Sequence, residues 1–190
     1  MKLTPFPFPL NIGTDIVHLP RICRLIRRPA SSNGNGGAKA TTTTATYLDR
    51  FIRRILCEEE LKDYYAKFSA LQHHSASGAK TLTTVSPPGP AMNAVNITEM
   101  ARWLAGRFAA KEAARKAAPG GASTIGWKDV MVRIDKERNG SGSVKPEIVY
   151  LKDGGVRGEV GKLSISHDGD YVVATVLAAT TRTTTQLPDG

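Results

Sequence analysis

The stretch Gly106–Gly121, GRFAAKEAARKAAPGG, decides the fold, because it predicts a long helix on which the rest of the chain packs. Apolar residues just before and within it recur at spacings of three and four, which is typical of a buried helical stripe: Met100, Trp103, Leu104 and Phe108. Thr98 is a suitable N-cap, and Pro119-Gly120-Gly121 ends the run. We therefore predict one helix from Thr98 to Ala118.

Alternating or continuous apolar patterns predict strands on both sides of this helix. After it come 127–135 (WKDVMVRID), 146–151 (PEIVYL), 161–167 (GKLSISH) and 171–179 (YVVATVLAA). Asp168-Gly169-Asp170 predicts a hairpin turn between the last two. Before the helix, Leu10–Val17 predicts a strand, Pro20–Arg28 a short helix, and 47–68 two helices that meet near Cys57. The predicted class is α+β, a small antiparallel sheet packed by one long helix.

The length and composition of the chain limit how it can be organised. With 190 residues and 41% hydrophobic content, we expect one domain over 1–180, flexible insertions at about 29–46 and 73–93, and a disordered tail at 181–190. The net charge of +9 and the pI of about 9.8 indicate an anionic partner. No apolar run reaches the length of a membrane helix. Cys23 and Cys57 fit no metal or redox spacing and are expected to be free thiols.

Glu112 can be interpreted in two ways. It lies at the edge of the buried stripe, and Lys116 follows four residues later. This spacing suits an ordinary ion pair that stabilises a helix by about 0.2–0.5 kcal/mol. Alternatively, Glu112 holds a divalent metal while Arg107, Lys111 and Lys116 face a ligand rich in phosphate. A metal such as Mg²⁺ then needs a second oxygen ligand.

Asp15 is a candidate for that second ligand, because it is an acidic residue in an otherwise apolar strand. The alternative is an Asp at a strand end that caps a turn. His167 shares one face of its predicted strand with Leu163 and Ile165. It either bonds to backbone at the hairpin end or donates a hydrogen bond to a phosphate or substrate.

The short helix after Asp15 is basic. Its arginines recur at spacings of three and four and share one face: Arg21, Arg24, Arg27 and Arg28. This face is either simply solvated or a docking surface for an acidic partner.

Four stretches together resemble a known family, the holo-acyl-carrier-protein synthases, which are the small single-domain class of 4'-phosphopantetheinyl transferases. They are IGTDIV (12–17), FIRRILCEEEL (51–61), WLAGRFAAKEAARKA (103–117) and SISHDGDYVVATV (164–176), and they occur in the family's order. The two insertions resemble eukaryotic, fungal members, which generally serve a mitochondrial carrier protein.

The resemblance implies an α+β homotrimer with active sites between subunits. It implies Mg²⁺-dependent transfer of 4'-phosphopantetheine from coenzyme A to a serine of apo acyl carrier protein, for fatty acid biosynthesis, with release of 3',5'-ADP. The proton acceptor for the serine stays open between Glu112 and a metal-bound water. Small alanines in the long helix are expected to leave room for a nucleotide and a neighbouring subunit.

The resemblance also assigns roles to residues by position. Asp15 and Glu112 match the family's metal-binding carboxylates, and Lys116 matches the lysine beside the reacting phosphate. The positions implied for coenzyme A are Arg107, Lys111, Gly120, Gly121 and His167. The positions implied for the acidic carrier protein are Arg21, Arg24 and Arg28.

Several positions depart from the family. His18 stands where Glu is usual, and Cys57 replaces a Thr that would cap the next helix through a box with Glu60. Pro119-Gly120-Gly121 replaces a Gly-Thr-Gly. The alternative from another class is a basic binding module for RNA or an acidic protein without catalysis. The low aromatic content of 6% and the lack of an RNA-binding motif argue against RNA.

Overall fold

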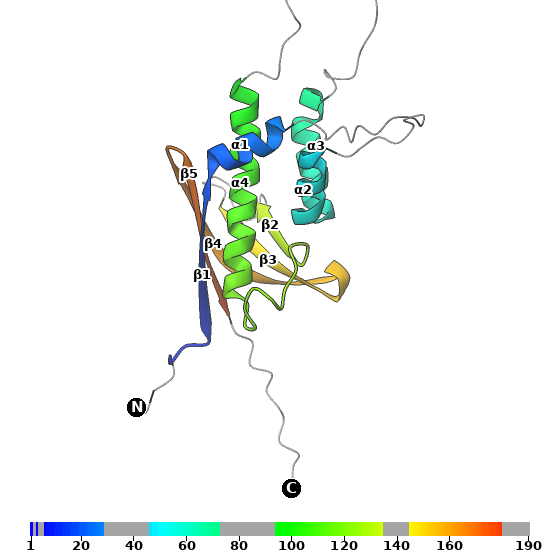
Figure 1. Ribbon diagram of the computed structural model, residues 1–190. Helices are drawn as coiled ribbons and strands as arrows, with labels where there is room; N and C mark the ends of the chain where they lie inside the picture. The colour runs from blue at the N-terminus through cyan, green and yellow to red at the C-terminus, as the bar shows by residue number, and fades with distance from the viewer. Residues whose placement is uncertain (2, 4–5, 29–45, 73–93, 135–144, 180–190) are drawn as a thin grey trace, which may run out of the picture.

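A five-stranded antiparallel sheet in the order β1-β5-β4-β3-β2 carries the long helix α4 across one of its faces (Figure 1). The computed structural model describes residues 1, 3, 6–28, 46–72, 94–134 and 145–179. The strands are β1 (Leu10–His18), β2 (Val130–Ile134), β3 (Pro146–Lys152), β4 (Arg157–Asp168) and β5 (Tyr171–Ala179). The helices are α1 (Leu19–Arg27), α2 (Tyr47–Ile55), α3 (Glu58–Gln72), α4 (Ala94–Ala117) and the 3-10 turn η2 (Asp153–Gly155). The predicted α+β class is confirmed.

Alanines on α4 form the contact with the sheet. Seven have no exposed surface: Ala101, Ala105, Ala109, Ala110, Ala113, Ala114 and Ala117. Their small side chains let the helix lie close to the strands, since α4 contacts β1 and β5 most extensively. The expectation that these alanines leave room for a nucleotide is therefore wrong; they belong to the core.

The helix starts in this region differ in part from prediction. Thr98 does not cap α4, because the helix already runs from Ala94, and Ile97 extends its buried stripe. The predicted boundary near Cys57 is confirmed. There Cys57 N donates to Glu60 Oε2 at 3.1 Å, so half of the expected capping box is kept without a threonine.

Two strand boundaries also shift. The strand predicted to start at Trp127 begins only at Val130, because residues 127–129 form a turn. The strand predicted to start at Gly161 begins at Arg157. The glycine-rich stretch before it forms η2, in which Gly154 and Gly155 take positive φ. The predicted hairpin turn at Gly169 is confirmed.

The predicted insertions at 29–46 and 73–93 and the tail at 181–190 lie almost wholly outside the described residues; only Thr46 falls inside, where it caps α2. Among the helices that are described, none combines the length and the apolar character needed to span a membrane.

Candidate functional site

The seam between β1 and α4 carries Asp15. On β1, Gly13, Asp15 and Val17 alternate toward the helix, and Gly13 lies against it so closely that an added Cβ would be 2.0 Å from Ala113 O. Glycine is required here because the helix backbone occupies the place of a side chain. The close approach brings Asp15 beside the last turns of α4.

Lys116 bridges the two elements. Its Nζ donates to Thr14 O and to Asp15 Oδ1, both at 2.9 Å. The lysine side chain is 46% exposed and that of Asp15 17%. The predicted site residues Asp15 and Lys116 are thus brought together, although 101 positions separate them in the chain.

Glu112 does not form the ion pair expected from its spacing to Lys116. Its Oε1 instead accepts from Arg115 Nη1 at 3.1 Å, and the two side chains are about one-fifth exposed. Within the described residues, each carboxylate at the seam therefore has its own cation, Lys116 for Asp15 and Arg115 for Glu112.

The donor set at the seam suits a hard divalent cation that also binds its substrate. The described residues contain no cluster of three or more His, Cys, Asp or Glu side chains that could enclose a metal by themselves. Two carboxylates leave most of an octahedral shell to other oxygens, and Mg²⁺ typically completes such a shell with water and substrate phosphates. Asp15 and Glu112 therefore fit Mg²⁺ held jointly by protein and substrate.

Lys111 does not face a ligand, and its prediction as a coenzyme-binding residue is wrong. The side chain has no exposed surface; its Nζ contacts Glu60 Oε2 at 2.5 Å. It also donates to Val130 O at 2.6 Å and Trp127 O at 3.0 Å. Burial lowers the pKa of Lys111, and the Glu60 carboxylate opposes this shift. Helical spacing predicts which side of the helix Lys111 lies on. It does not predict that α3 and β2 pack against that side.

Glu60 connects several elements of the core, which the sequence did not predict beyond the role of Glu60 at a helix start. It is 1% exposed, and besides Lys111 it accepts from Cys57 N and from Val132 N at 3.0 Å. One buried carboxylate thus joins α3, α4 and β2. The signal in the sequence was the third acidic residue of CEEE, three positions after Cys57.

Arg107 lies away from Asp15 and Glu112. Its guanidinium stacks on Trp103 at 3.4 Å, with Glu60 at 4.0 Å and Asp63 at 3.9 Å. Its Nε is buried without a hydrogen-bond partner in the described structure. Burial lowers the pKa of this guanidinium, and the two carboxylates oppose the shift. Arg107 and Glu112 point to different sides of α4, because five residues turn a helix by about 140° past one full turn.

His167 is exposed on β4, on the face that Leu163 and Ile165 share, as predicted. Strand β5 lies between it and Asp15, so the two backbones are at least two strand spacings, about 10 Å, apart. Gly121 has φ of 77° and its N donates to Ala118 O. Gly120 and Gly121 shape the turn after α4, and their contact with coenzyme A stays a prediction.

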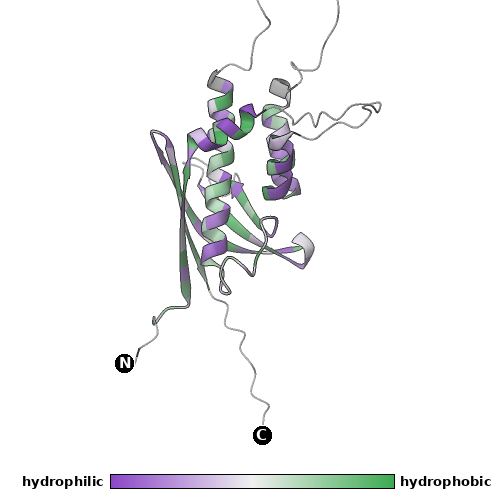
Figure 2. Cartoon of the chain, viewed as in Figure 1, coloured by the Kyte–Doolittle hydropathy of each residue, from purple (hydrophilic) through white to green (hydrophobic). Residues whose placement is uncertain are grey.

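The basic face of α1 is exposed as predicted, and Figure 2 shows its alternation with apolar residues. Arg21 lines a cavity of about 290 Å³ together with Arg54, Phe108 and Trp127. Phe108 lies one helical turn before Glu112, and Val17, which also lines the cavity, lies two residues after Asp15; neither carboxylate lines the cavity itself. Arg28 stacks on Tyr47 at 3.8 Å, beyond the end of α1.

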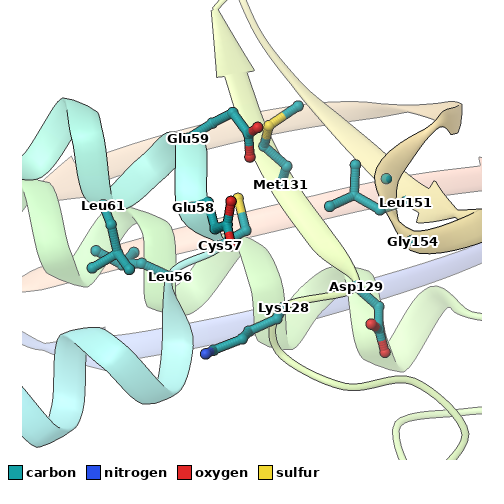
Figure 3. Close-up of a pocket in the computed structure, with 11 residues that line it drawn as sticks. Leu56, Cys57, Glu58, Glu59, Leu61, Lys128, Asp129, Met131, Leu151 and Gly154 are labelled. Atoms are coloured by element: carbon teal, nitrogen blue, oxygen red, sulfur yellow. The ribbon is translucent and has the colours of Figure 1, made fainter.

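A second cavity, of about 500 Å³, contains none of the predicted site residues (Figure 3). It is lined by Glu58 and Glu59 from the start of α3 and by Lys128, Asp129 and Met131 from β2 and the turn before it. Cys57 lines it, and burial raises the pKa of its thiol to about 11, assisted by Glu60. That thiol stays protonated at neutral pH.

Comparisons with known proteins agree with this architecture. The sequence profile of the 4'-phosphopantetheinyl transferase superfamily matches residues 11–176. A relative from Aspergillus fumigatus named 4'-phosphopantetheinyl transferase B, mitochondrial, is 54% identical over 94% of this chain and 99% of its own. A holo-[acyl-carrier-protein] synthase from Chlamydia pneumoniae is 30% identical over 89% of this chain and 96% of its own. The solved structure of a Plasmodium yoelii acyl carrier protein synthase with ADP bound has a TM-score of 0.50 at 20% identity, covering 90% of this chain and 96% of that one, and shows the fold alone.

Proposed function

The chain belongs to the 4'-phosphopantetheinyl transferase superfamily, and we propose that Asp15, Glu112 and Lys116 carry the transfer. The protein is an enzyme that moves the 4'-phosphopantetheine group from coenzyme A to a serine of apo acyl carrier protein, giving holo carrier protein and 3',5'-ADP. The alternative of a non-catalytic binding module is therefore set aside. The observation that carries the residue assignment is the β1–α4 seam, where Asp15 and Lys116 meet one turn from Glu112.

Asp15 and Glu112 would hold Mg²⁺ together with the pyrophosphate oxygens of coenzyme A. When bound, the ion neutralises charge on the pyrophosphate as the bond to the leaving group breaks. The Lys116 side chain is about half exposed beside Asp15, and its ammonium would stabilise the negative charge on departing 3',5'-ADP.

The serine oxygen bonds to the phosphorus of the 4'-phosphate while the bond from that phosphorus to the 3',5'-ADP oxygen breaks, and the electron pair leaves with 3',5'-ADP. The hydroxyl proton goes to a base at the seam, for which Glu112 and water are the two candidates. Atoms and charge balance without any further reactant.

The carrier protein would dock on α1. Arg21, Arg24 and Arg28 offer exposed positive charge to an acidic partner, and Arg21 also lines the cavity that contains Phe108, one helical turn before Glu112. Such charges raise the rate of encounter more than the final affinity. This placement would bring the carrier serine to the seam.

A second copy of the chain would complete the site. Arg107 and His167 lie away from Asp15 within one chain. The sheet face opposite α4 exposes apolar side chains on both sides of the hydrogen-bonded Thr14–Thr175 pair. Ile12 is 69% and Ile16 60% exposed, and Ile12 pairs in register with exposed Leu177. An apolar patch of this kind marks an interaction surface. We expect a homotrimer in light scattering; a monomer at working concentration would contradict the shared site.

The deciding experiment uses apo acyl carrier protein, coenzyme A and Mg²⁺, and follows the phosphopantetheine mass increment on the carrier. We expect the increment with wild-type protein, its loss with EDTA, and its loss in Glu112→Gln while circular dichroism shows a folded chain. Wild-type turnover by Glu112→Gln would refute the metal role of this carboxylate.

The compartment is proposed to be mitochondrial, because the Aspergillus relative carries that name. Fractionation of cells that express the tagged full chain tests this; recovery in the cytosol alone would contradict it.

A further inference from the structure

Arg115 uses its whole guanidinium to join Glu112 to the connection between α4 and β2. Its Nη1 donates to Glu112 Oε1 at 3.1 Å, its Nε to Ile125 O at 2.9 Å, and its Nη2 to Ala122 O at 2.7 Å. The guanidinium also lies 4.7 Å from the ring centroid of Trp127. The side chain is only 19% exposed. Four separate contacts therefore hold Arg115 in one orientation.

Lys111, one turn before Arg115 on α4, also holds the connection between α4 and β2 through hydrogen bonds. Lys111 donates to Trp127 O and Val130 O, and Glu60 balances its charge as Glu112 balances that of Arg115. Trp127 in turn stacks on Phe108 at 4.9 Å. Residues 122–130 are thus attached to α4 by two cations, and this rigid attachment fixes where Arg115 presents its nitrogens.

We infer that Arg115 is a positioning residue for the transfer reaction. It holds Oε1 of Glu112 against the fixed connection, and this leaves the second carboxylate oxygen to bind the metal. The inference rests on the proposed metal role of Glu112. Within the described residues Glu112 has no other hydrogen-bond or ion-pair partner, so Arg115 alone sets its orientation.

A simple counter-ion role makes the opposite prediction for metal affinity. If Arg115 merely opposed the charge of Glu112, its removal would strengthen attraction for a cation. If Arg115 positions Glu112, its removal weakens metal binding, since loss of a residue that orients a metal ligand typically costs about 10–100-fold in affinity. Lysine at this position keeps the charge but lacks the planar fork that bonds three oxygens at once.

The experiment measures binding of Mn²⁺, as the probe metal, to the full chain in the presence of coenzyme A by electron paramagnetic resonance of the free ion. Arg115→Gln and Arg115→Lys are compared with wild type. Arg157→Gln is the matched control, because Arg157 pairs with exposed Asp153 outside the site. Circular dichroism and urea unfolding check that each variant is folded, and Arg115→Lys serves if Arg115→Gln is not.

We expect both Arg115 variants to bind Mn²⁺ at least about tenfold more weakly, and Arg157→Gln to bind as wild type. In turnover, kcat should fall while KM for the carrier protein stays unchanged, since α1 is untouched. Tighter or unchanged Mn²⁺ binding in folded Arg115 variants would overturn the inference.

Glu112→Gln separates this outcome from failure of the proposed function. If Glu112→Gln loses Mn²⁺ binding but the Arg115 variants keep it, the metal role stands and the positioning role is wrong. If Glu112→Gln binds Mn²⁺ as wild type, the metal role itself is wrong, and the positioning role, which rests on it, is overturned with it.

Discussion

Substitution of Gly13 by alanine tests the contact on which the whole site depends. The added Cβ would lie 2.0 Å from Ala113 O and 2.8 Å from Ala117 N, whereas real Cβ atoms essentially never approach within 3.0 Å. Both atoms are helix backbone and cannot rotate away. Strand β1 and helix α4 must therefore separate by about 1 Å, the difference between 2.0 and 3.0 Å.

This separation has a cost in stability and a larger one in activity. Overpacking of a core costs typically about 1–3 kcal/mol, and we expect the upper end because the clash is with backbone. For a chain of this size that corresponds to a fall in melting temperature of about 6–12 °C. Asp15 follows Gly13 by two residues, and a misplacement of about 1 Å can cost about 10²-fold in rate.

The assay is urea unfolding followed by the carrier-modification rate on folded protein. Gly106→Ala is the matched control, because an added Cβ there meets nothing within 4 Å and the position lies inside α4. It should stabilise the protein by about 0.5–1 kcal/mol. If Gly13→Ala matched wild type in both stability and rate, the close packing of β1 on α4 would not be what positions Asp15.

Three further changes test other parts of the structure. Lys111→Met should destabilise folding by about 3–5 kcal/mol in urea, because it removes the nearest cation of buried Glu60 and leaves it only Arg107 at 4.0 Å; adding Glu60→Gln should recover part of the loss, and no recovery would contradict the pairing. The Cys57 thiol, with its pKa raised from 9.0 to about 11, keeps its proton longer in the folded state, so the free energy of unfolding should fall as pH rises from 9 to 11. Cys57→Thr should remove this part of the pH dependence in urea titrations; an unchanged slope would argue against it. Arg21→Glu should raise KM for the carrier about fivefold to tenfold with little change in kcat; an effect that does not shrink at high salt would contradict electrostatic docking.

Much of the fold could be predicted because its signals are local. The stripe of Met100 and Leu104, the alternation of β5 and the Asp-Gly-Asp turn each depend on residues close in sequence. The order IGTDIV, AAKEA, SISHD then identified the family. The errors lay at the ends of helices and strands. Thr98 has a side chain suited to an N-cap, but Ile97 is buried in the core and α4 begins before Thr98, at Ala94.

The candidate site was harder to predict than the fold. Arg107 and Lys111 are four residues apart, so helical spacing alone puts them on one side of α4. It could not show that α3 and β2 cover that face and turn Lys111 into a core residue paired with Glu60. Whether a charged face is solvated, bound to ligand or buried depends on what packs against it.

The sequence by itself determined the elements, the family and which charges are available near α4. Only the tertiary structure decided how those charges pair. By spacing, Glu112 and Lys116 form an ordinary helical pair. In the fold, Lys116 turns to Asp15 and Glu112 to Arg115. The physical reason is the absent side chain of Gly13, which lets β1 approach the helix backbone and bring a carboxylate from 101 residues away within hydrogen-bond distance of Lys116.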